Sequence, residues 1–445
     1  MPARAHHPVA PVRTSHPFPP RNPAFAPNAA GGRRVAGRLV AAGCAALVLL
    51  GGAPLTAAAQ EPAGCPGAAA PPPAVDTSEV PAPGEPVPEP LPVPDEPVGG
   101  ARLGECGEIN APGAPPAALD PIASQSWVLA DLDTGEVLAA RDPHARHRPA
   151  STIKVLTALV AIRELDLSDT LVVTQDDADQ EGSRVGLEPG TTYSVEQVLA
   201  GLIMQSGNDA AHALARKLGG IDDTVRKMNA LADELGAHDT RAATPSGLDG
   251  PGMSTSAYDL ALIFREAMRH PEFAHAESVR ETTLPGKPGG PPLPVESDNA
   301  VLWNYPGALG GKTGFTDDAR HTFIAAAERD GRRLVAVLMR GENKPVRQSK
   351  FTMQLLDHGF SLRPGTSVGE LVTEPEPSEE PEEPAAQAAA DGDLPSSPMF
   401  GTVGVPLTAL AVLIIVVAGA FAVLRRRRTR LAAARRAANR GPDHP

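Results

Sequence analysis

The sequence predicts an α+β fold, in which an antiparallel sheet built from both ends of one domain is flanked by helices. Two observations support this prediction. Apolar runs with strand character lie near the start and near the end of a stretch of about 245 residues, which is long enough for one sizeable core. The segments between these runs carry apolar residues at helical spacing. Strands that flank a helical middle commonly share one sheet, so the first and last strands should pair.

The domain should open with a β-hairpin. Residues 127–132 and 137–140 are apolar runs, and the Asp-Thr-Gly sequence at 133–135 between them is typical of a turn. A helix should follow Pro149. It is predicted from the helical spacing of Val155, Leu156, Leu159, Val160 and Ile162.

The later elements are predicted in the same way. Ser194 and Gln197 have the spacing of a capping box, which should open a second helical stretch. The remaining elements are a helix over about 256–268, two adjacent antiparallel strands over 321–327 and 334–339, and a closing helix over about 345–358.

Linkers should lie on both sides of this domain. The 445 residues include 49 prolines and 43 glycines, too many for one continuous core. Sequence of this kind cannot bury enough apolar area to offset the entropy lost on ordering. We therefore expect a disordered, Pro-rich linker over 60–118, a folded domain over 119–363 and an acidic, Pro- and Glu-rich linker over 364–400.

Both ends of the chain have the pattern of an exported, anchored protein. Basic residues at 33–38 precede an apolar run over 39–50 and a small-residue cleavage site near Ala59, so 1–59 is predicted to be a signal peptide with a long N-terminal extension. Residues 403–424 carry no charge and precede four arginines, which predicts a transmembrane helix and a basic cytoplasmic tail over 425–445. The folded domain should then face the outside of the cell membrane.

Charge and cysteine content narrow the partners and the compartment. The net charge is -13, the acid collects over 370–393, and no basic patch predicts a nucleic-acid partner. Cleavage of the signal peptide would leave Cys65 and Cys106. An oxidising compartment permits a disulfide between them, but both lie in Pro-rich sequence, so paired and free thiols are both compatible with the sequence.

Ser151-Thr152-Ile153-Lys154, at the predicted start of a helix, could carry nucleophilic chemistry. A spacing of three places the hydroxyl and the amine on one helical face, so the amine could accept the hydroxyl proton. A lysine serves as a base when burial and a second cation lower its pKa. Taken alone, the pattern is more typical of a capping serine.

Two further motifs lie after Ser151 and Lys154 in the chain. Lys312-Thr313-Gly314 comes after two glycines and enters an apparent strand, where its backbone could approach a ligand while the charge and hydroxyl hold a carboxylate. Ser206-Gly207-Asn208 lies in the second helical stretch and could relay a proton and position an amide. In isolation, the latter motif is more typical of a turn between helices.

Together these motifs resemble those of the serine penicillin-recognising enzymes, and most closely those of the low-molecular-mass D-alanyl-D-alanine carboxypeptidases. The likeness rests on four segments, at 149–154, 205–211, 246–249 and 311–316, and covers about residues 120–361. It implies a β-lactamase/transpeptidase-like fold with a mostly helical subdomain, a substrate that is a peptidoglycan stem peptide ending in D-Ala-D-Ala, acylation by β-lactam antibiotics, and no cofactor or metal.

The resemblance also implies a role for each site residue. Ser151 would attack the peptide bond between two D-alanines, and Lys154 would accept its proton. Ser206 would help to protonate the leaving D-alanine, and Asn208 would hold Lys154 and the substrate amide. The terminal carboxylate would be bound by Lys312, Thr313 and Arg347 beside Gly314, with the backbone N–H groups of Ser151 and Phe315 as the oxyanion hole. Phe315 departs from the family pattern, because many relatives have a polar side chain there.

Other functions remain open on the sequence alone. A class A β-lactamase would share the first and third motifs, but here Gly207 stands in the middle motif and no Glu-x-x-Leu-Asn segment is present. A catalytically silent wall-binding module would not need Ser151 and Lys154. A zinc carboxypeptidase would be expected to carry a His-Glu-x-x-His motif, which this sequence lacks. We therefore interpret His144 and His147 as solvated. Carboxypeptidase action and endopeptidase action on cross-links use the same groups.

Overall fold

The computed structural model describes residues 65–117 and 124–373. The predicted signal peptide, transmembrane helix and basic tail lie outside these residues, as does most of the predicted acidic linker. Over 65–117 and 124–373, none of the helices has both the length and the apolar character needed to cross a membrane.

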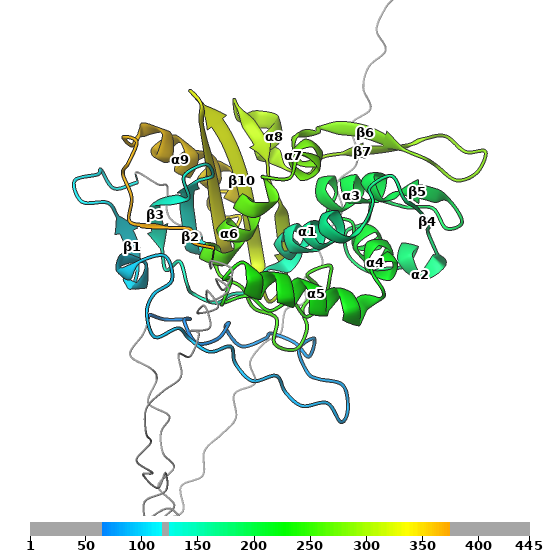
Figure 1. Ribbon diagram of the computed structural model, residues 1–445, viewed down its shortest axis with the longest axis horizontal. Coiled ribbons are helices and arrows are strands. Elements are labelled where there is room, and N and C mark those ends of the chain that lie inside the picture. The colour runs from blue at the N-terminus through cyan, green and yellow to red at the C-terminus, as the bar shows by residue number, and fades with distance from the viewer. Residues whose placement is uncertain (1–64, 118–123, 374–445) are drawn as a thin grey trace, which may run out of the picture. The chain divides into compact units, whose positions relative to one another are not determined.

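One antiparallel sheet organises the domain (Figure 1). Its strands run in the order β1-β3-β2-β11-β10-β8, with β12 beside β3 and β9 beside β10. Their bounds are β1 Glu108–Asn110, β2 Ser124–Asp131, β3 Glu136–Arg141, β8 Ala308–Gly310, β9 Thr313–Thr316, β10 Arg320–Arg329, β11 Arg332–Gly341 and β12 Gly369–Glu370. The predicted hairpins are β2–β3 and β10–β11, and β2 pairs with β11. The two ends of the domain therefore share one sheet, as the sequence predicts.

Helices cover both faces of this sheet. Helix α9 (Gln348–Ser361) packs on β2, β10 and β11, and α6 (Ala257–Ala267) packs on β2 and β11 (Figure 1). Side chains of β2 alternate between these layers, because Trp127 and Leu129 join the core under α9 whereas Val128 joins the core under α6. Because both faces of β2 are covered, these residues are apolar on both sides, which explains the continuous apolar run from which the strand was predicted.

A mostly helical part continues from the α6 side of the sheet. Its helices are α1 Lys154–Glu164, α2 Gln175–Ala178, α3 Val195–Met204, α4 Asn208–Lys217, α5 Ile221–Glu234, α7 Pro271–Ser278 and α8 Ala300–Asn304. Two small hairpins, β4 Thr170–Val172 with β5 Thr192–Ser194 and β6 Glu281–Leu284 with β7 Leu293–Glu296, accompany them. The predicted capping box of Ser194 and Gln197 opens α3, and Ser256 caps α6.

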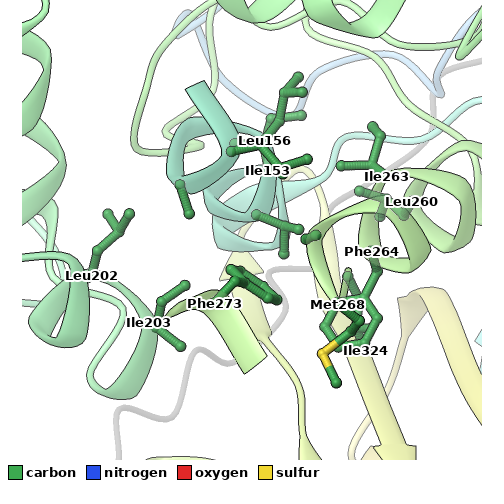
Figure 2. Close-up of a cluster of buried hydrophobic side chains, with 14 of the residues drawn as sticks. Ile153, Leu156, Leu202, Ile203, Leu260, Ile263, Phe264, Met268, Phe273 and Ile324 are labelled. Atoms are coloured by element: carbon green, nitrogen blue, oxygen red, sulfur yellow. The ribbon is translucent and has the colours of Figure 1, made fainter. Parts of the chain in front are cut away.

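The core between the helices and the sheet holds the start of α1 in place. Figure 2 shows its labelled side chains, which come from the start of α1, from α3, α6 and α7, and from β10: Ile153, Leu156, Leu202, Ile203, Leu260, Ile263, Phe264, Met268, Phe273 and Ile324. The rings of Phe264 and Phe273 meet edge to face at 5.8 Å. Because such a core is close-packed, the residues at the start of α1 are fixed relative to the sheet.

Residues 65–117 pack against the domain, so the prediction of a disordered linker over 60–118 is wrong for this stretch. Cys65 and Cys106 form a disulfide, which settles the alternatives that the sequence left open. A 3-10 turn, η1 (Ala101–Gly104), precedes β1, which pairs with β3. Leu103 and Ile109 are buried.

Buried arginines of the domain order this segment. Arg146 donates to three backbone carbonyls of the segment, those of Ala69, Leu91 and Pro92. Arg148 forms an ion pair with Glu79. Proline-rich backbone has few N–H groups to pair with its own carbonyls, which leaves these free to accept from side chains. Low hydrophobicity predicted disorder because it measures only what the segment could bury by itself.

The acidic linker also begins later than predicted. After α9 the chain returns to the sheet as β12, and Val368 and Leu371 are buried. The hydroxyl of Tyr258 donates to the carbonyl of Glu370 at 2.8 Å. Residues 364–373 therefore belong to the domain, although acid and proline dominate the sequence that follows them.

Candidate active site

Ser151 lies in a short 3-10 turn, η2 (Ala150–Ile153), that leads into α1. The sequence placed it at the start of the helix itself. Ala150 has a left-handed backbone, with φ of 48°. The carbonyl of Pro149 fixes the turn, because it accepts hydrogen bonds from Thr152 Oγ1 at 2.6 Å and from Thr322 Oγ1 of β10 at 2.7 Å. A strained residue of this kind persists only where its surroundings hold it.

The side chains of Ser151 and Lys154 meet across this turn. Lys154 Nζ lies 2.8 Å from Ser151 Oγ and 2.7 Å from Asn208 Oδ1. The carbonyl oxygen of Ser246 is its third neighbour. A neutral amine has two hydrogens, which suit the amide and carbonyl oxygens, and one lone pair, which suits the hydroxyl proton of Ser151. The geometry therefore fits a base aimed at the serine.

Electrostatics favours the neutral form of this amine. Lys154 is fully buried. Burial, and then the positive charge of Lys312, hold the pKa of Lys154 well below its ordinary value of 10.5, while Asp209 and Asp298 oppose this shift. Burial and a nearby second cation are the two conditions that the sequence analysis required for Lys154 to act as a base.

Ser206 lies in the turn between two helices, and Asn208 is the first residue of the second helix. Helix α3 ends at Met204, and Asn208 begins α4. Ser206 has φ of 56°, and its buried Oγ has no hydrogen-bond partner among the residues that the structure describes. Asn208 Nδ2 donates to the carbonyl of Glu181 at 2.6 Å. Ser206 lines the same cleft as Ser151, so its hydroxyl is available to a ligand there.

Asp209 orders the loop beside this turn. Its carboxylate accepts hydrogen bonds from the backbone N–H groups of Val185, Gly186 and Leu187 at 3.0, 2.9 and 3.0 Å. Asp209 belongs to the 205–211 segment, but the sequence alone predicts no role for it. Charged acceptors bind backbone N–H groups strongly, so this residue holds the loop against which Asn208 rests.

Strand β9 brings the third motif to the serine. A side chain on Gly314 would place its Cβ 2.3 Å from Thr322 Oγ1 and 3.0 Å from the backbone nitrogen of Ser151. Only glycine allows this approach. Lys312 is buried, and its Nζ donates to the carbonyl of Thr313 at 2.9 Å. Burial lowers the pKa of Lys312, while Asp298 and Glu277 act in the opposite direction.

Among the described residues β9 pairs only with β10, so its outer edge is open to a ligand. The N–H of Ile324 in β10 binds the carbonyl of Lys312 at 2.8 Å, and Phe315 stands opposite His321. In an antiparallel pair this register points the N–H of Phe315 away from β10. Phe315 is 47% exposed, and its ring packs against His321 in a tilted arrangement with centroids 4.6 Å apart. The backbone N–H therefore faces the cleft although the side chain offers no hydrogen bond.

These groups surround one cleft of about 380 Å³. It is lined by Ser151, Ser206, Thr313, Gly314, Phe315 and Arg347, among others. Arg347 is exposed and directly precedes α9, which begins at Gln348 and not at Pro345 as predicted. Of the nine sequence-predicted site residues, six line this cleft. The other three contact lining residues or one another: Lys154 contacts Ser151 and Asn208, and Lys312 bonds the carbonyl of Thr313.

The two histidines considered as zinc ligands lie elsewhere, and the prediction that both are solvated is wrong. His147 is 4% exposed. His144 Nδ1 lies 3.0 Å from Asp239, and with Asp259 these groups approach within 4.8 Å of one another, close enough to hold a cation. The cluster is already satisfied, because Arg146 also binds Asp239 and the carbonyl of Val98 binds His144.

The sequence of residues 112–343 matches the family model of D-alanyl-D-alanine carboxypeptidases, peptidase family S11. This region contains every sequence-predicted site residue except Arg347. The chain belongs to this carboxypeptidase family. Its members are serine hydrolases, which agrees with a serine and a buried lysine in hydrogen-bond contact.

Similar proteins from two organisms place the chain within the S11 family. It is 51% identical over 253 residues to the D-alanyl-D-alanine carboxypeptidase DacB2 of Mycobacterium tuberculosis, a match that covers 56% of this chain and 86% of that protein. It is 32% identical to DacF of Bacillus subtilis, covering 54% of this chain and 62% of that protein. The chain therefore spans less than two thirds of the Bacillus relative.

Solved structures of relatives have the same transpeptidase-like fold. A D-alanyl-D-alanine carboxypeptidase from M. tuberculosis matches with a TM-score of 0.56 and 47% identity, covering 59% of this chain and 99% of that one. A DD-transpeptidase from Streptomyces matches with a TM-score of 0.52 and 26% identity, covering 55% of this chain and all of that one.

Three groups of this S11 site have no motif in the sequence. The carbonyl of Ser246 touches Lys154, Glu277 binds the backbone of Gly311 at 2.6 Å, and Asp298 binds Thr313 at 2.8 Å. Ser246 lies in one of the segments that carry the resemblance, but the group that acts is its backbone carbonyl, which side-chain identity does not reveal. Glu277 and Asp298 are single acids whose contacts depend on tertiary packing.

Proposed function

We propose that this protein is a serine D-alanyl-D-alanine carboxypeptidase that trims the terminal D-alanine from peptidoglycan stem peptides. The observation that carries the proposal is the 2.8 Å contact between Ser151 Oγ and a buried Lys154 amine whose pKa is depressed. Family membership supplies the substrate class. The stem peptide ending in D-Ala-D-Ala would lie in the cleft along the open edge of β9.

Acylation begins when Ser151 Oγ attacks the carbonyl carbon between the two D-alanines. The hydroxyl proton passes to Lys154 Nζ as the C–O bond forms. Negative charge then develops on the carbonyl oxygen, where the N–H groups of Ser151 and Phe315 can stabilise it. Ser151 N faces β9 and Phe315 N points to the open edge, so both donors approach the same space.

The tetrahedral intermediate collapses when the C–N bond breaks. The proton held by Lys154 reaches the departing amine through the hydroxyl of Ser206, which has no other partner within 65–117 and 124–373. D-Alanine leaves and the peptide remains as an ester on Ser151. Water then adds to the carbonyl carbon of that ester and gives a proton to Lys154. The bond between this carbon and Ser151 Oγ breaks as Lys154 returns the proton to Oγ, which releases the shortened peptide and restores both Ser151 and the neutral amine.

The terminal carboxylate would bind at the positive end of the cleft. Arg347 and Lys312 supply charge, and Thr313 supplies a hydroxyl. Asn208 would orient both Lys154 and the substrate amide, because its Oδ1 already accepts from Lys154. Gly314 would let the substrate backbone approach β9.

The same groups would react with β-lactams, which resemble the D-Ala-D-Ala end. A rapid β-lactamase needs a second base that activates the deacylating water. The one carboxylate among the lining residues of the described cleft is Asp298, which accepts a hydrogen bond from Thr313. We therefore propose a long-lived penicilloyl ester on Ser151 and slow turnover.

The test uses purified full-length protein and a tripeptide ending in D-Ala-D-Ala. We expect release of free D-alanine, detected by mass spectrometry, and stable labelling by a fluorescent penicillin. Ser151→Ala should abolish both, whereas Ser278→Ala, an exposed serine at the end of α7, should retain both. Absence of D-alanine release by the parent protein, or a penicillin adduct on the Ser151 variant, would refute the proposal.

We also propose that the catalytic domain faces the outside of the cell membrane, held by a single span over 403–424 with 425–445 in the cytoplasm. The signal-like N-terminus and the arginines after the apolar run support this orientation. The disulfide between Cys65 and Cys106 supports an oxidising compartment. Protease added to intact spheroplasts should digest the domain but spare a tag at the C-terminus, and the reverse pattern would refute the orientation.

A further inference from the structure

Asp298 is a carboxylate within the cleft that no catalytic motif includes. It is exposed and lines the cleft together with Ser151, Thr313 and Arg347. Its Oδ2 accepts a hydrogen bond from Thr313 Oγ1 at 2.8 Å. An ionised carboxylate only accepts hydrogen bonds, so Thr313 gives its single hydroxyl hydrogen to Asp298.

The backbone around Asp298 is firmly placed. Its N–H donates to the carbonyl of Met204, the last residue of α3, at 2.9 Å. The side chain of the next residue, Asn299, caps α8 through the N–H of Val301 and also donates to the carbonyl of Gly311 at 3.0 Å. Residues 298–299 therefore join the end of the helix before Ser206 to the backbone before Lys312, and the carboxylate of Asp298 projects from a fixed point.

We propose that Asp298 is an internal competitor for the carboxylate end of the substrate and so determines how strongly the site binds carboxylate-terminated peptides. The inference rests on the proposed function. Thr313 has one hydroxyl hydrogen, and Asp298 and a substrate carboxylate cannot both receive it. Binding must break the contact between Thr313 and Asp298 and place a second negative charge beside Asp298. Lys312 and Arg347 favour the substrate, and Asp298 opposes it.

The negative charge of Asp298 also affects the pKa of Lys154, the proposed base. It raises the pKa of Lys154 and of Lys312, against the larger effect of burial. The base form of Lys154 is the neutral amine, which is present above its pKa. Removing the negative charge of Asp298 lowers that pKa further, so the neutral amine extends to lower pH. The acidic limb of the pH profile of kcat/KM should then move to lower pH.

The test compares Asp298→Asn with the parent protein on two tripeptides, one ending in D-Ala-D-Ala and one ending in D-Ala-D-Ala amide. The asparagine keeps the shape of the side chain, removes its charge and can donate a hydrogen bond. For the carboxylate substrate we expect KM to fall about threefold to tenfold, since two charges about 4 Å apart repel by on the order of 1 kcal/mol in water. For the amide substrate KM should not fall, and the acidic limb should shift downward.

Glu296→Gln is the matched control, because Glu296 is an exposed carboxylate two residues away in β7 and its loss changes the net charge equally. Its KM values should equal those of the parent. A rise in KM for the carboxylate substrate in Asp298→Asn would show that Asp298 orients Thr313 for binding and would overturn the proposal. An equal fall in KM for both substrates, or the same fall in the control, would also overturn it. A parent protein that releases no D-alanine would refute the proposed function as well.

Discussion

Lys154 shows how one residue can be both part of a core and part of the chemistry. Its stem lies in the packed start of α1, and its amine contacts three oxygens, none of them a carboxylate oxygen, among the residues that the structure describes. A charged amine in that place would lack a counter-ion, which is why burial lowers its pKa. The property that makes Lys154 reactive is thus a consequence of packing.

Lys154→Met keeps most of the buried stem and removes the base. We expect the rate of acylation by a fluorescent penicillin to fall about 10²–10⁴-fold, the usual contribution of a positioned base. The increase of the parent's rate as pH rises through the depressed pKa of Lys154 should disappear as well. Lys287→Met, an exposed lysine in the β6–β7 turn, should leave the rate unchanged. A Lys154→Met rate within tenfold of the parent would exclude this residue as the base.

Glu277 predicts a pH dependence of stability. Its Oε2 accepts from the N–H of Gly311 at 2.6 Å, its Oε1 has no partner among the described residues, and burial raises its pKa from 4.5 to about 7. The folded state therefore holds the proton more tightly than the unfolded chain. This contribution to stability is complete below about pH 4.5 and is lost as pH rises through 7.

Glu277→Gln should remove this dependence. The free energy of unfolding of the parent, relative to the variant, should decrease by about 3 kcal/mol between pH 4.5 and 8, since each pKa unit corresponds to about 1.4 kcal/mol. Urea unfolding at several pH values measures the difference. Glu328→Gln, an exposed acid on β10, should show no such trend. A difference between parent and Glu277→Gln that stays constant with pH would contradict the shifted pKa.

At the scale of elements, strands and helices with their own periodicity could be predicted from the sequence, but segments ordered by other elements could not. The β2–β3 and β10–β11 hairpins and the capping box of Ser194 follow from local pattern. The Pro-rich segment over 65–117 has no such pattern. It is ordered because Arg146 and Arg148, buried in the domain, need acceptors that this segment supplies. The composition of the segment does not reveal the buried arginines of the domain that bind it.

The ion pair between Glu79 and Arg148 tests this account of the segment. Arg148 is 3% exposed, so Glu79→Gln leaves a buried charge without its partner. We expect the free energy of unfolding to fall by about 1–3 kcal/mol and residues 65–99 to become sensitive to limited proteolysis. Glu85→Gln, an exposed acid in the same segment, is the control. Equal stability of both variants would mean that this ion pair does not contribute to holding the segment.

At the scale of the whole molecule, the motifs identified the cleft but not all of its charges. Ser151, Ser206 and Lys312 are far apart in the chain and were predicted to meet because their types and order suit one reaction. Asp298 and Glu277 act on Lys312 from elements that carry no motif. Their positions depend on how α7 and the residues before α8 pack against the start of β9, which local pattern does not specify.

The position at which the folded domain ends differs between the family match, the sequence prediction and the structure. The family match ends at residue 343, the sequence predicts a domain end at 363, and the structure continues to 373. Beyond 343, α9 covers Trp127 and Leu129 on the outer face of the sheet. Beyond 363, Val368 and Leu371 are buried beside β3. Each extension therefore covers apolar surface that a shorter chain would expose to water.

Three chains that all begin at residue 65 can separate these boundaries. The chain ending at 373 should be the most stable. Loss of Val368 and Leu371 in the chain ending at 363 should lower the free energy of unfolding by about 3–6 kcal/mol, at about 1.5–3 kcal/mol for each buried side chain. The chain ending at 343 should fail to fold, because one face of the sheet loses its helix. If urea unfolding gives equal midpoints for the chains ending at 363 and 373, β12 contributes nothing and the domain ends where the sequence placed it.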